Sequence, residues 1–435
     1  MNRILLEKLY RWKDRSDRKP LLLKGVRQSG KTYLLKEFGK EAYSDVAYFN
    51  FEGNEHLHKC FEQDLDPRRI ATELGVFRRG SITPGKTLII LDEIQFCNRA
   101  LTSLKYFCED APEYHVVCAG SLLGIALSKP LSFPVGKVDL LTLRPMSFYE
   151  FVLAYQEKEM LEYLSGLDAH VKMPEVFTGK LMEHLRNYFI VGGMPEVVAK
   201  WIETKDIPEV ERVQQRILDS YELDFAKHAP VSDIPKLNLI WRSIPDQLAR
   251  ENGKFIFSHA KPGARAKDLE DALEWLISAG MVYKIPRIEK PFVPLSAYAD
   301  PHYFKLYATD VGLLRKMARL SADAIYQGPE TYKEFKGALA ENFALTELLN
   351  AGGDMPFYWK SRNMAEVDFV TQWNNRIVPI EVKSGTNRTA RSLAEYRKRF
   401  SPEISVKVSL GNLETGIVMN IPLYLIWKIG DYIGK

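Results

Sequence analysis

Short hydrophobic runs alternate with amphipathic stretches along the first third of the chain. Apolar runs at Pro20–Lys24, Val46–Phe51, Lys86–Leu91 and Tyr114–Ala119 predict buried strands. The first run is followed by helical spacing at Thr32–Phe38. Strands that alternate with helical segments are typical of a parallel sheet covered by helices on both faces. We therefore expect a doubly wound α/β domain over residues 1–144.

The remaining chain divides into three segments with different patterns. Residues 145–225 have mainly helical spacing, interrupted by the glycines and proline of Val191–Pro195, and predict a helical lid. Residues 226–330 run as helix, turn, second helix and strand, which is the outline of a winged helix but also a common outline. Residues 331–435 predict a small α/β domain. Its expected elements are helices at Phe335–Asn350 and Arg391–Phe400, with strands at Met355–Trp359, Glu366–Trp373, Arg376–Val382, near Lys407, and at Leu423–Ile429.

Composition excludes several classes of protein. The 435 residues are 46% hydrophobic and 27% charged, as in a globular protein of two or three domains, and neither disorder nor a fibrous class is indicated. A net charge of +4 does not by itself identify a nucleic-acid binder. The four cysteines have neither zinc-site spacing nor a disulfide framework, so reduced thiols are expected. Without a signal peptide or a run long enough to span a membrane, the sequence predicts a cytoplasmic protein with no membrane partner.

A complete phosphate-binding motif follows the first predicted strand. The sequence from Gly25 to Thr32 matches G-x-x-x-x-G-K-[ST] and opens the predicted helix. Glycine lets the backbone curl so that successive N–H groups point at phosphate oxygens. Lys31 would reach the β- and γ-phosphates of ATP, and the Thr32 hydroxyl would ligate Mg²⁺. The expected nucleotide-binding residues of this loop are Gly25, Val26, Arg27, Gln28, Ser29, Gly30, Lys31 and Thr32.

Two adjacent acids end the third predicted strand. In Leu88–Glu93, apolar residues precede Asp92 and Glu93. Asp92 would hold hydrated Mg²⁺, and Glu93 would polarise the attacking water, so the prediction of hydrolysis depends on Glu93. Standing alone, such a pair would be read as solvated acids at a strand end. Together with the phosphate loop, it predicts a P-loop ATPase.

Other polar residues near these strands have less specific signals. Ser121 follows the fourth predicted strand and is a candidate γ-phosphate sensor or nucleotide contact, although it could equally cap the next helix. An arginine from a neighbouring subunit often completes such sites, which would require a homo-oligomer. Arg99, Arg144 and Arg186 are conceivable, but an arginine in a surface ion pair is the commoner situation.

A second group of charged residues lies near the C-terminus. Asp368 falls on one predicted strand, Glu381 and Lys383 share a face of the next, and Glu341 lies on the preceding helix. Two or three carboxylates and a lysine can hold Mg²⁺ and activate water against a phosphodiester, as in PD-(D/E)xK nucleases. Charged strand ends in an ordinary α/β domain are the alternative. A basic cluster suited to a phosphate backbone accompanies the group, with an aromatic residue among its members. It comprises Arg388, Arg391, Tyr396, Arg397, Lys398, Arg399 and Lys407, which could also form a solvated helical face.

The order of motifs resembles a known family. The motifs are Gly25–Thr32, Leu91–Gln95, Ala119–Ser121, Leu143–Phe148, Gly192–Pro195, Lys305–Gly312, Glu366–Phe369 and Glu381–Gly385. They are similar to those of bacterial and archaeal AAA+-like ATPases, of the archaeal ATPase and STAND-related branch, that carry a C-terminal domain of unknown function. The resemblance implies a C-terminal domain with a restriction-endonuclease-like fold, preceded by a winged-helix segment. Relatives often have Gly-Arg where this chain has Gly136 and Lys137, and lysine cannot supply a bidentate fork to phosphate.

These observations predict a multi-domain α/β protein that binds and hydrolyses ATP with Mg²⁺. Its nucleotide state would control a C-terminal half that binds nucleic acid, DNA rather than RNA, with a candidate nuclease site at Glu341, Asp368, Glu381 and Lys383. The alternative is an ATP-dependent switch that docks a protein partner on a non-catalytic endonuclease-like scaffold, because fold alone does not decide function.

Overall fold

A computed structural model describes residues 2–120, 136–250, 253–328, 330–361, 365–385 and 390–434. The chain divides into two compact units. Unit 1 comprises Met1–Arg144 with Ser278–Met281, and unit 2 comprises Pro145–Ile277 with Val282–Lys435. Each unit has its own sheet. None of the described helices is long and apolar enough to cross a bilayer.

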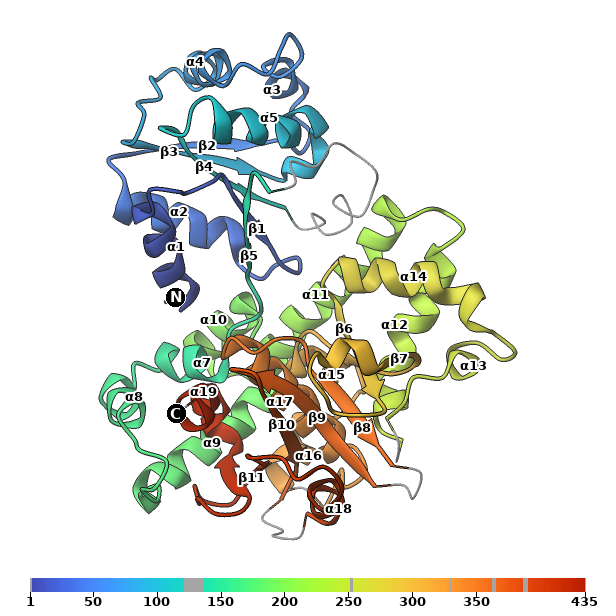
Figure 1. The fold of residues 1–435 in the computed structure, drawn as a ribbon. Coiled ribbons are helices and arrows are strands. Elements are labelled where there is room, and N and C mark those ends of the chain that lie inside the picture. Colours follow the sequence, from blue (N-terminus) through green and yellow to red (C-terminus); the bar gives the residue numbers. More distant parts are fainter. Residues whose placement is uncertain are drawn as a thin grey trace. The chain divides into compact units, whose positions relative to one another are not determined.

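Unit 1 is a parallel sheet with helices on both faces (Figure 1). The strand order is β2-β3-β4-β1-β5, and each neighbouring pair is parallel. The strands are β1 Leu21–Lys24, β2 Asp45–Asn50, β3 Thr87–Asp92, β4 His115–Ala119 and β5 Asp139–Thr142. The helices are α1 Leu5–Asp14, α2 Lys31–Ala42, α3 Glu55–Lys59, α4 Pro67–Phe77, η1 Ile94–Phe96 and α5 Asn98–Glu109. The predicted α/β fold of this region is confirmed, although β5 was not predicted.

Alternation along the strands of unit 1 explains its layers. Leu21 and Leu23 of β1 pack into a core with α1 and α2, whereas Leu22 belongs to the core on the opposite face, which includes residues of α4 and α5. Successive strand side chains point to opposite faces, so a continuous apolar run fills both cores. The sheet is therefore buried on both sides, and its accessible polar chemistry lies at the strand ends.

Unit 2 begins with helices and ends in a mixed sheet. Its helices before the sheet are α7 Phe148–Ala154, α8 Lys158–Ser165, α9 Glu175–Val191, α10 Pro195–Thr204, α11 Ile207–His228, α12 Ile234–Leu248, α13 Phe257–Ala260 and α14 Ala266–Ser278. The predicted helical content of residues 145–225 agrees with α7 to α11. Their role as a lid remains a prediction.

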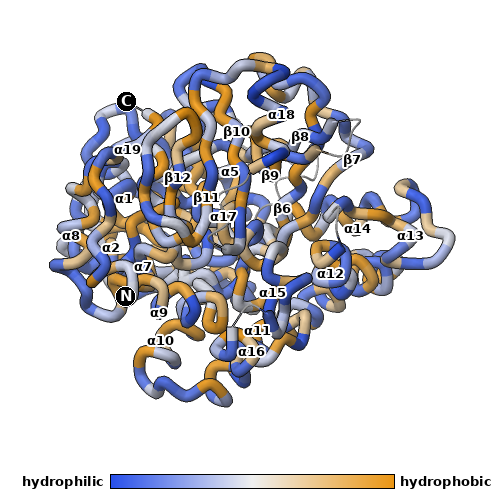
Figure 2. The backbone as a smooth tube through the Cα atoms, turned by 90° about the horizontal axis from the view of Figure 1, so that it is seen from below, coloured by the Kyte–Doolittle hydropathy of each residue, from blue (hydrophilic) through white to orange (hydrophobic). Residues whose placement is uncertain are grey.

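Seven strands form the sheet of unit 2, in the order β12-β11-β10-β9-β8-β6-β7. They are β6 Val282–Ile288, β7 Ala299–Ala308, β8 Phe357–Lys360, β9 Glu366–Trp373, β10 Arg376–Val382, β11 Val406–Ser409 and β12 Met419–Pro422. The other elements are η2 Leu295–Tyr298, α15 Val311–Met317, α16 Ala322–Gln327, α17 Lys336–Asn350, α18 Arg391–Phe400, η3 Leu423–Lys428 and α19 Ile429–Ile433. Figure 2 shows hydrophobic positions along β10 and β11. Strands β6 and β7 from the segment 226–330 thus share one sheet with the strands of residues 331–435.

One element near the C-terminus differs from the sequence prediction. The run Leu423–Ile429 was expected to be a strand, but Leu423–Lys428 is the 3₁₀ helix η3 and Ile429 begins α19. Leu423, Leu425 and Ile426 are all at most 1% exposed. A short apolar run buried on every side has no period that separates a strand from a buried helix.

Three motifs that are distant in sequence meet in unit 2. The Met146 amide donates to the Gly193 carbonyl at 2.6 Å, and the Gly193 amide donates to the Asp310 carboxylate at 2.6 Å. Asp310 also accepts the Leu313 amide at 2.8 Å and so caps α15. Burial raises the pKa of Asp310 to about 6. The motifs around Pro145, Gly192 and Asp310 therefore have a shared structural role, because each supplies backbone or side-chain partners to another.

Candidate functional site

The phosphate loop joins the end of β1 to the start of α2 in unit 1. Its backbone has positive φ at Gly25 (156°), Gln28 (63°) and Gly30 (91°). A Cβ atom at Gly25 would lie 2.1 Å from the Leu143 carbonyl oxygen, so only glycine fits there. The loop is thus curled tightly, as binding of an anion by backbone N–H groups requires.

Lys31 lies inside this loop and is only 6% exposed. Its Nζ donates to the carbonyl oxygens of Gly25 at 2.8 Å and Val26 at 2.9 Å. Burial lowers the pKa of Lys31 to about 8, although Glu93 and Asp92 act in the opposite direction. Among the described residues, no carboxylate forms a direct ion pair with Lys31, so its hydrogen-bond partners are the two loop carbonyls.

Asp92 ends β3 and is 3% exposed. Its Oδ2 accepts the Thr32 hydroxyl at 2.7 Å and the Tyr48 hydroxyl at 2.9 Å. Its Oδ1 accepts the Glu93 amide at 3.1 Å. The hydroxyl and the carboxylate that were expected to share Mg²⁺ therefore already touch, which brings together two of the predicted residues from β3 and α2.

Glu93 follows the strand in a left-handed conformation, with φ 51°. The Gln95 side-chain amide donates to Glu93 Oε2. A non-glycine residue with positive φ stores backbone strain, which persists when the surrounding structure requires it, most often at functional sites.

Ser29 provides a test of whether phosphate fits the loop. Its hydroxyl is fully buried and has no hydrogen-bond partner within the described part of the chain. A buried hydroxyl without a partner is costly unless a ligand completes it. Together with the Lys31 ammonium, which has only loop carbonyls as partners, this donor fits an incoming polyanion. The residues present are therefore compatible with ATP and Mg²⁺.

Several residues that support the loop were not found by sequence reasoning. Tyr48 and Gln95 contact the two acids, and Arg3 donates to the Ser29 carbonyl at 2.9 Å and to the Arg144 carbonyl at 2.6 Å. Tyr48 reaches Asp92 because β2 lies beside β3, which no local motif indicates. Strand order must be known before this contact can be predicted.

The remaining candidates of unit 1 have varied positions. Ser121 lies outside the described residues. The Arg99 side chain donates to the Phe61 carbonyl, and Lys137 pairs with Glu109 at 2.8 Å. A role in trans for Arg99, Arg144 or Arg186 remains a prediction.

The C-terminal charged residues converge in unit 2. Lys383 pairs with Glu381 at 2.6 Å, and the other Glu381 oxygen accepts the Leu393 amide at the start of α18, at 3.0 Å. Asp368 accepts the Val382 amide at 2.7 Å. Glu341 and Asp368 are close enough that Glu341, after burial, raises the pKa of Asp368 well above its ordinary value.

A buried lysine that sequence reasoning did not select joins these carboxylates. Lys305 is 1% exposed and its Nζ lies 2.6 Å from Glu366 and 3.2 Å from Glu341. The Tyr307 hydroxyl also donates to Glu341, at 2.8 Å. Burial alone lowers the pKa of Lys305, but Glu341, Tyr307 and Glu366 outweigh it and raise the pKa well above its ordinary value. Over the described residues, no three His, Cys, Asp or Glu side chains are arranged to hold a metal ion.

Comparison with known proteins assigns the class of the first unit. Residues 17–152 match the family described as AAA domain, so this part of the chain is an ATPase-like AAA domain with a P-loop fold. Residues 182–324 and 336–425 match two domains of unknown function, DUF8612 and DUF4143. No curated protein matches the chain.

The chain is similar to several solved structures at low sequence identity. The Walker-type ATPase PAby2304 of Pyrococcus abyssi is 14% identical, with a TM-score of 0.44 over 72% of this chain and 94% of its own. The RuvB Holliday junction branch migration motor of Thermotoga maritima is 14% identical, with a TM-score of 0.29 over 66% of this chain and 90% of its own. The Aeropyrum pernix Orc1 protein, in complex with DNA, is 13% identical, with a TM-score of 0.28 over 73% of this chain and 90% of its own.

Proposed function

We propose that this protein binds and hydrolyses ATP with Mg²⁺ at the loop of unit 1. The observation that carries the proposal is the 2.7 Å hydrogen bond between Thr32 and Asp92, with Glu93 next in the chain. Mg²⁺ supplies charge neutralisation on the phosphate oxygens when it is bound. Thr32 and Asp92 would hold it, and Lys31 would exchange its carbonyl partners for phosphate oxygens. Glu93 would orient the attacking water and accept its proton.

Two substitutions separate binding from hydrolysis. Lys31→Ala should weaken ATP binding at least ~100-fold, because it removes the buried ammonium that faces the phosphates. Glu93→Gln should keep binding within about threefold while phosphate release falls ~100-fold or more, as expected for loss of a general base. Isothermal titration and a phosphate-release assay measure the two quantities.

Lys40→Ala is the matched control on the same helix. Lys40 is exposed and pairs with Glu37 at 2.9 Å, outside the loop. Its substitution should leave binding and turnover unchanged. Undiminished hydrolysis in Glu93→Gln would remove that residue from its assigned role, and unchanged binding in Lys31→Ala would contradict the ATP site itself.

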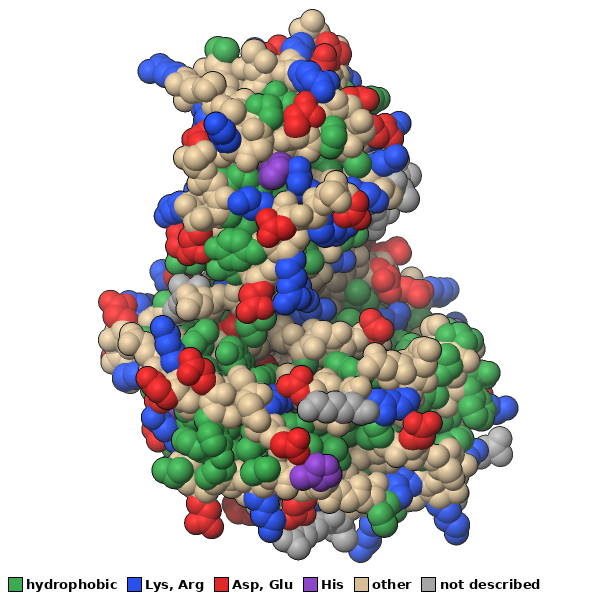
Figure 3. Space-filling model, turned by 60° about the vertical axis from the view of Figure 1, so that its left-hand side comes forward, with side chains coloured by type: hydrophobic (Ala, Val, Ile, Leu, Met, Phe, Trp, Pro, Cys, Tyr) green, Lys and Arg blue, Asp and Glu red, His purple; other side chains and the backbone are tan. Residues whose placement is uncertain are grey.

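We further propose that the nucleotide state of unit 1 controls nucleic-acid binding by unit 2. The supporting observation is the basic character of α18, whose last turn contains Arg397, Lys398 and Arg399. Among the described residues, none of the three has an ion-pair partner, so they are available to phosphates. On the face shown in Figure 3, basic and acidic side chains are interspersed. Arg388 lies outside the described residues.

A Mg²⁺-dependent nuclease at Glu341, Asp368, Glu381 and Lys383 is the catalytic form of this proposal. It is supported by the convergence of these side chains at the ends of β9 and β10. A non-catalytic scaffold that docks a protein partner is the competing function, and a different observation favours it. The buried ammonium of Lys305 already pairs with Glu341 and Glu366, so these two acids have a positive partner without a metal ion.

A cleavage assay distinguishes these two functions. Wild type, Asp368→Ala and Glu381→Ala are incubated with single- and double-stranded DNA and RNA, with Mg²⁺ or Mn²⁺, and with or without ATP. The nuclease proposal expects cleavage by wild type and ~100-fold less by either variant. Absence of cleavage in every condition, or equal cleavage by the variants, would leave the scaffold function.

A further inference from the structure

Unit 2 contains a compact cavity with aromatic and apolar walls, apart from the Lys305 network. Its volume is about 270 Å³, and it lies among α9, α16, the start of α17 and the segments that follow β10 and β11. Phe189, Tyr326, Tyr332 and Leu339 supply much of its apolar lining. This volume lies just below the usual range for small-molecule pockets, about 300–1,000 Å³, so the cavity suits a compact ligand of at most about mononucleotide size.

Two cations line the cavity without anionic partners. Arg186, from α9, is exposed, and Lys336, the first residue of α17, is half-buried. Neither has an ion-pair partner in the part of the chain that the structure describes. Arg186 is near enough to Tyr332 to oppose the rise in the pKa of that phenol that burial causes. The cavity therefore combines an apolar wall with two charges that remain available.

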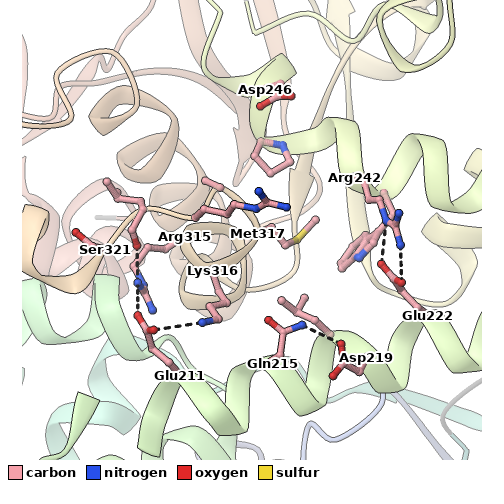
Figure 4. A pocket seen from close by; sticks show the side chains of 16 residues that line it. Glu211, Gln215, Asp219, Glu222, Arg242, Asp246, Arg315, Lys316, Met317 and Ser321 are labelled. Carbon is pink, nitrogen blue, oxygen red and sulfur yellow. Dashed lines mark hydrogen bonds and ion pairs between the residues drawn. The ribbon is translucent and has the colours of Figure 1, made fainter. Parts of the chain in front are cut away.

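A larger cavity in the same unit differs from the smaller one in the pairing of its charged side chains. The second cavity, of about 940 Å³, lies between α11, α12 and the end of α15. Figure 4 shows that its charges largely pair with one another, with Glu211 bound to Arg315 and Lys316. Arg242 and Glu222 form a further pair, at 2.8 Å. A charge-balanced, polar cavity of this kind needs no ionic ligand.

Further donors lie around the smaller cavity. Lys336 begins α17, a helix of 15 residues whose N-terminus has no side-chain cap. The partial positive charge of a helix N-terminus favours an anion. Ser384 and Tyr332 also line the cavity, and their hydroxyls have no hydrogen-bond partner among the residues described. Cations, hydroxyls and the helix start thus supply donors around one apolar space.

We propose that this cavity binds an aromatic ring that carries one phosphate, as in a nucleoside monophosphate. The ring would lie against Phe189 and Tyr326, because aromatic side chains stack on planar rings with little dependence on sequence. The phosphate would lie at Arg186, whose planar fork suits bidentate contact, and at Lys336. The ligand is either a free mononucleotide or the phosphorylated end of a nucleic-acid strand. The proposal does not depend on ATP hydrolysis or on nuclease activity.

Binding is tested in the whole chain with the Lys31→Ala substitution. This substitution prevents the nucleotide probes from binding at the ATP site of unit 1 instead of the cavity. The probes are AMP, adenosine, inorganic phosphate, and one single-stranded oligonucleotide with a 5′-phosphate or a 5′-hydroxyl. Calorimetry should show AMP binding at least tenfold tighter than adenosine or phosphate alone. Arg186→Met and Lys336→Met should each weaken that binding tenfold or more, and thermal unfolding checks that both variants remain folded.

Lys333→Met is the matched control, because Lys333 is 73% exposed and pairs with Glu330 rather than lining the cavity. It should change AMP binding less than twofold. Tight binding of the phosphorylated oligonucleotide without AMP binding would identify a strand end as the ligand. The proposal is overturned if no phosphorylated probe binds, if adenosine binds as tightly as AMP, or if the two cavity variants bind like the control.

Discussion

The two units each contain a buried lysine, a tyrosine and acidic side chains, but they arrange them in opposite ways. In unit 1, Lys31 is held by loop carbonyls while Asp92 accepts hydroxyls from Thr32 and Tyr48. In unit 2, Lys305 pairs directly with Glu341 and Glu366. The first site keeps its opposite charges apart, and the second neutralises them internally. A site that awaits a charged ligand has its charges unpaired, whereas a structural network has them paired.

This difference has an energetic consequence for the free protein. A buried cation without a carboxylate partner destabilises the fold until a ligand binds. A buried cation that pairs with two carboxylates cannot be removed without leaving those acids uncompensated. The same substitution of lysine by methionine, which keeps volume and removes charge, should therefore have opposite effects in the two units.

The largest effect is expected for Lys305→Met. It should reduce the free energy of unfolding by about 3–5 kcal/mol, because Glu341 and Glu366 lose their buried partner. The pKa of Asp368 is already raised by burial and by Glu341. Protonation of these acids relieves their repulsion, so the defect should shrink as the pH falls from 7 toward 5. Urea unfolding at several pH values measures both quantities.

Lys360→Met is the control for this prediction, because Lys360 pairs with the same acid, Glu366, at 3.1 Å but is more exposed. Its cost should be about 1 kcal/mol or less. If Lys305→Met were as mild as Lys360→Met, the network would not be the internally neutralised structure described above, and a metal at Glu341 and Asp368 would become the better explanation of the cluster.

Lys31→Met should instead stabilise the nucleotide-free protein by about 1–3 kcal/mol while abolishing ATP binding. Burial lowers the pKa of Lys31 to about 8, below its ordinary value of 10.5. Between these values the unfolded chain binds more protons than the folded chain, so wild-type stability rises with pH there. The advantage of the variant should therefore be largest at pH 7 and shrink toward pH 10.

Lys40→Met, at an exposed position on the same helix, should show no such pH dependence. The measurement is urea unfolding at pH 7 and 9.5 without nucleotide. A Lys31→Met variant that is less stable than wild type at pH 7 would mean that the loop carbonyls compensate the buried charge fully. The contrast between the two lysines would then be lost.

The same contrast explains what the sequence could and could not predict. The phosphate loop is contiguous, so Gly25 to Thr32 and the acids after β3 follow from local spacing. Lys305 and Glu366 meet only because β7, β6, β8 and β9 adopt a particular order, which no local pattern encodes. The strand β5 was missed because it is four residues long and only partly buried, without a distinct apolar run.

The candidate nuclease residues illustrate an intermediate case. Asp368 and Glu381 were placed on two successive strands by the strand pattern of the sequence, and β9 and β10 have the predicted bounds. Their partners were not predictable, because the backbone amides of Val382 and Leu393 and the ammonium of Lys305 depend on tertiary packing. Spacing therefore located the acids, but packing determines whether they are available to a metal.

The smallest effect concerns the two tyrosines that donate to the acids. Tyr48 donates to Asp92 at 2.9 Å and is partly exposed, whereas Tyr307 donates to Glu341 at 2.8 Å and is fully buried. Tyr48→Phe should cost about 0.5–1.5 kcal/mol, because Asp92 keeps its hydrogen bonds from the Thr32 hydroxyl and the Glu93 amide. Tyr307→Phe should cost about 1 kcal/mol more, since the Tyr307 hydroxyl is fully buried and a hydrogen bond to a carboxylate is stronger in such low-dielectric surroundings. Paired urea titrations at pH 7 give the difference, and equal costs would mean that the burial of Tyr307 does not strengthen its hydrogen bond to Glu341.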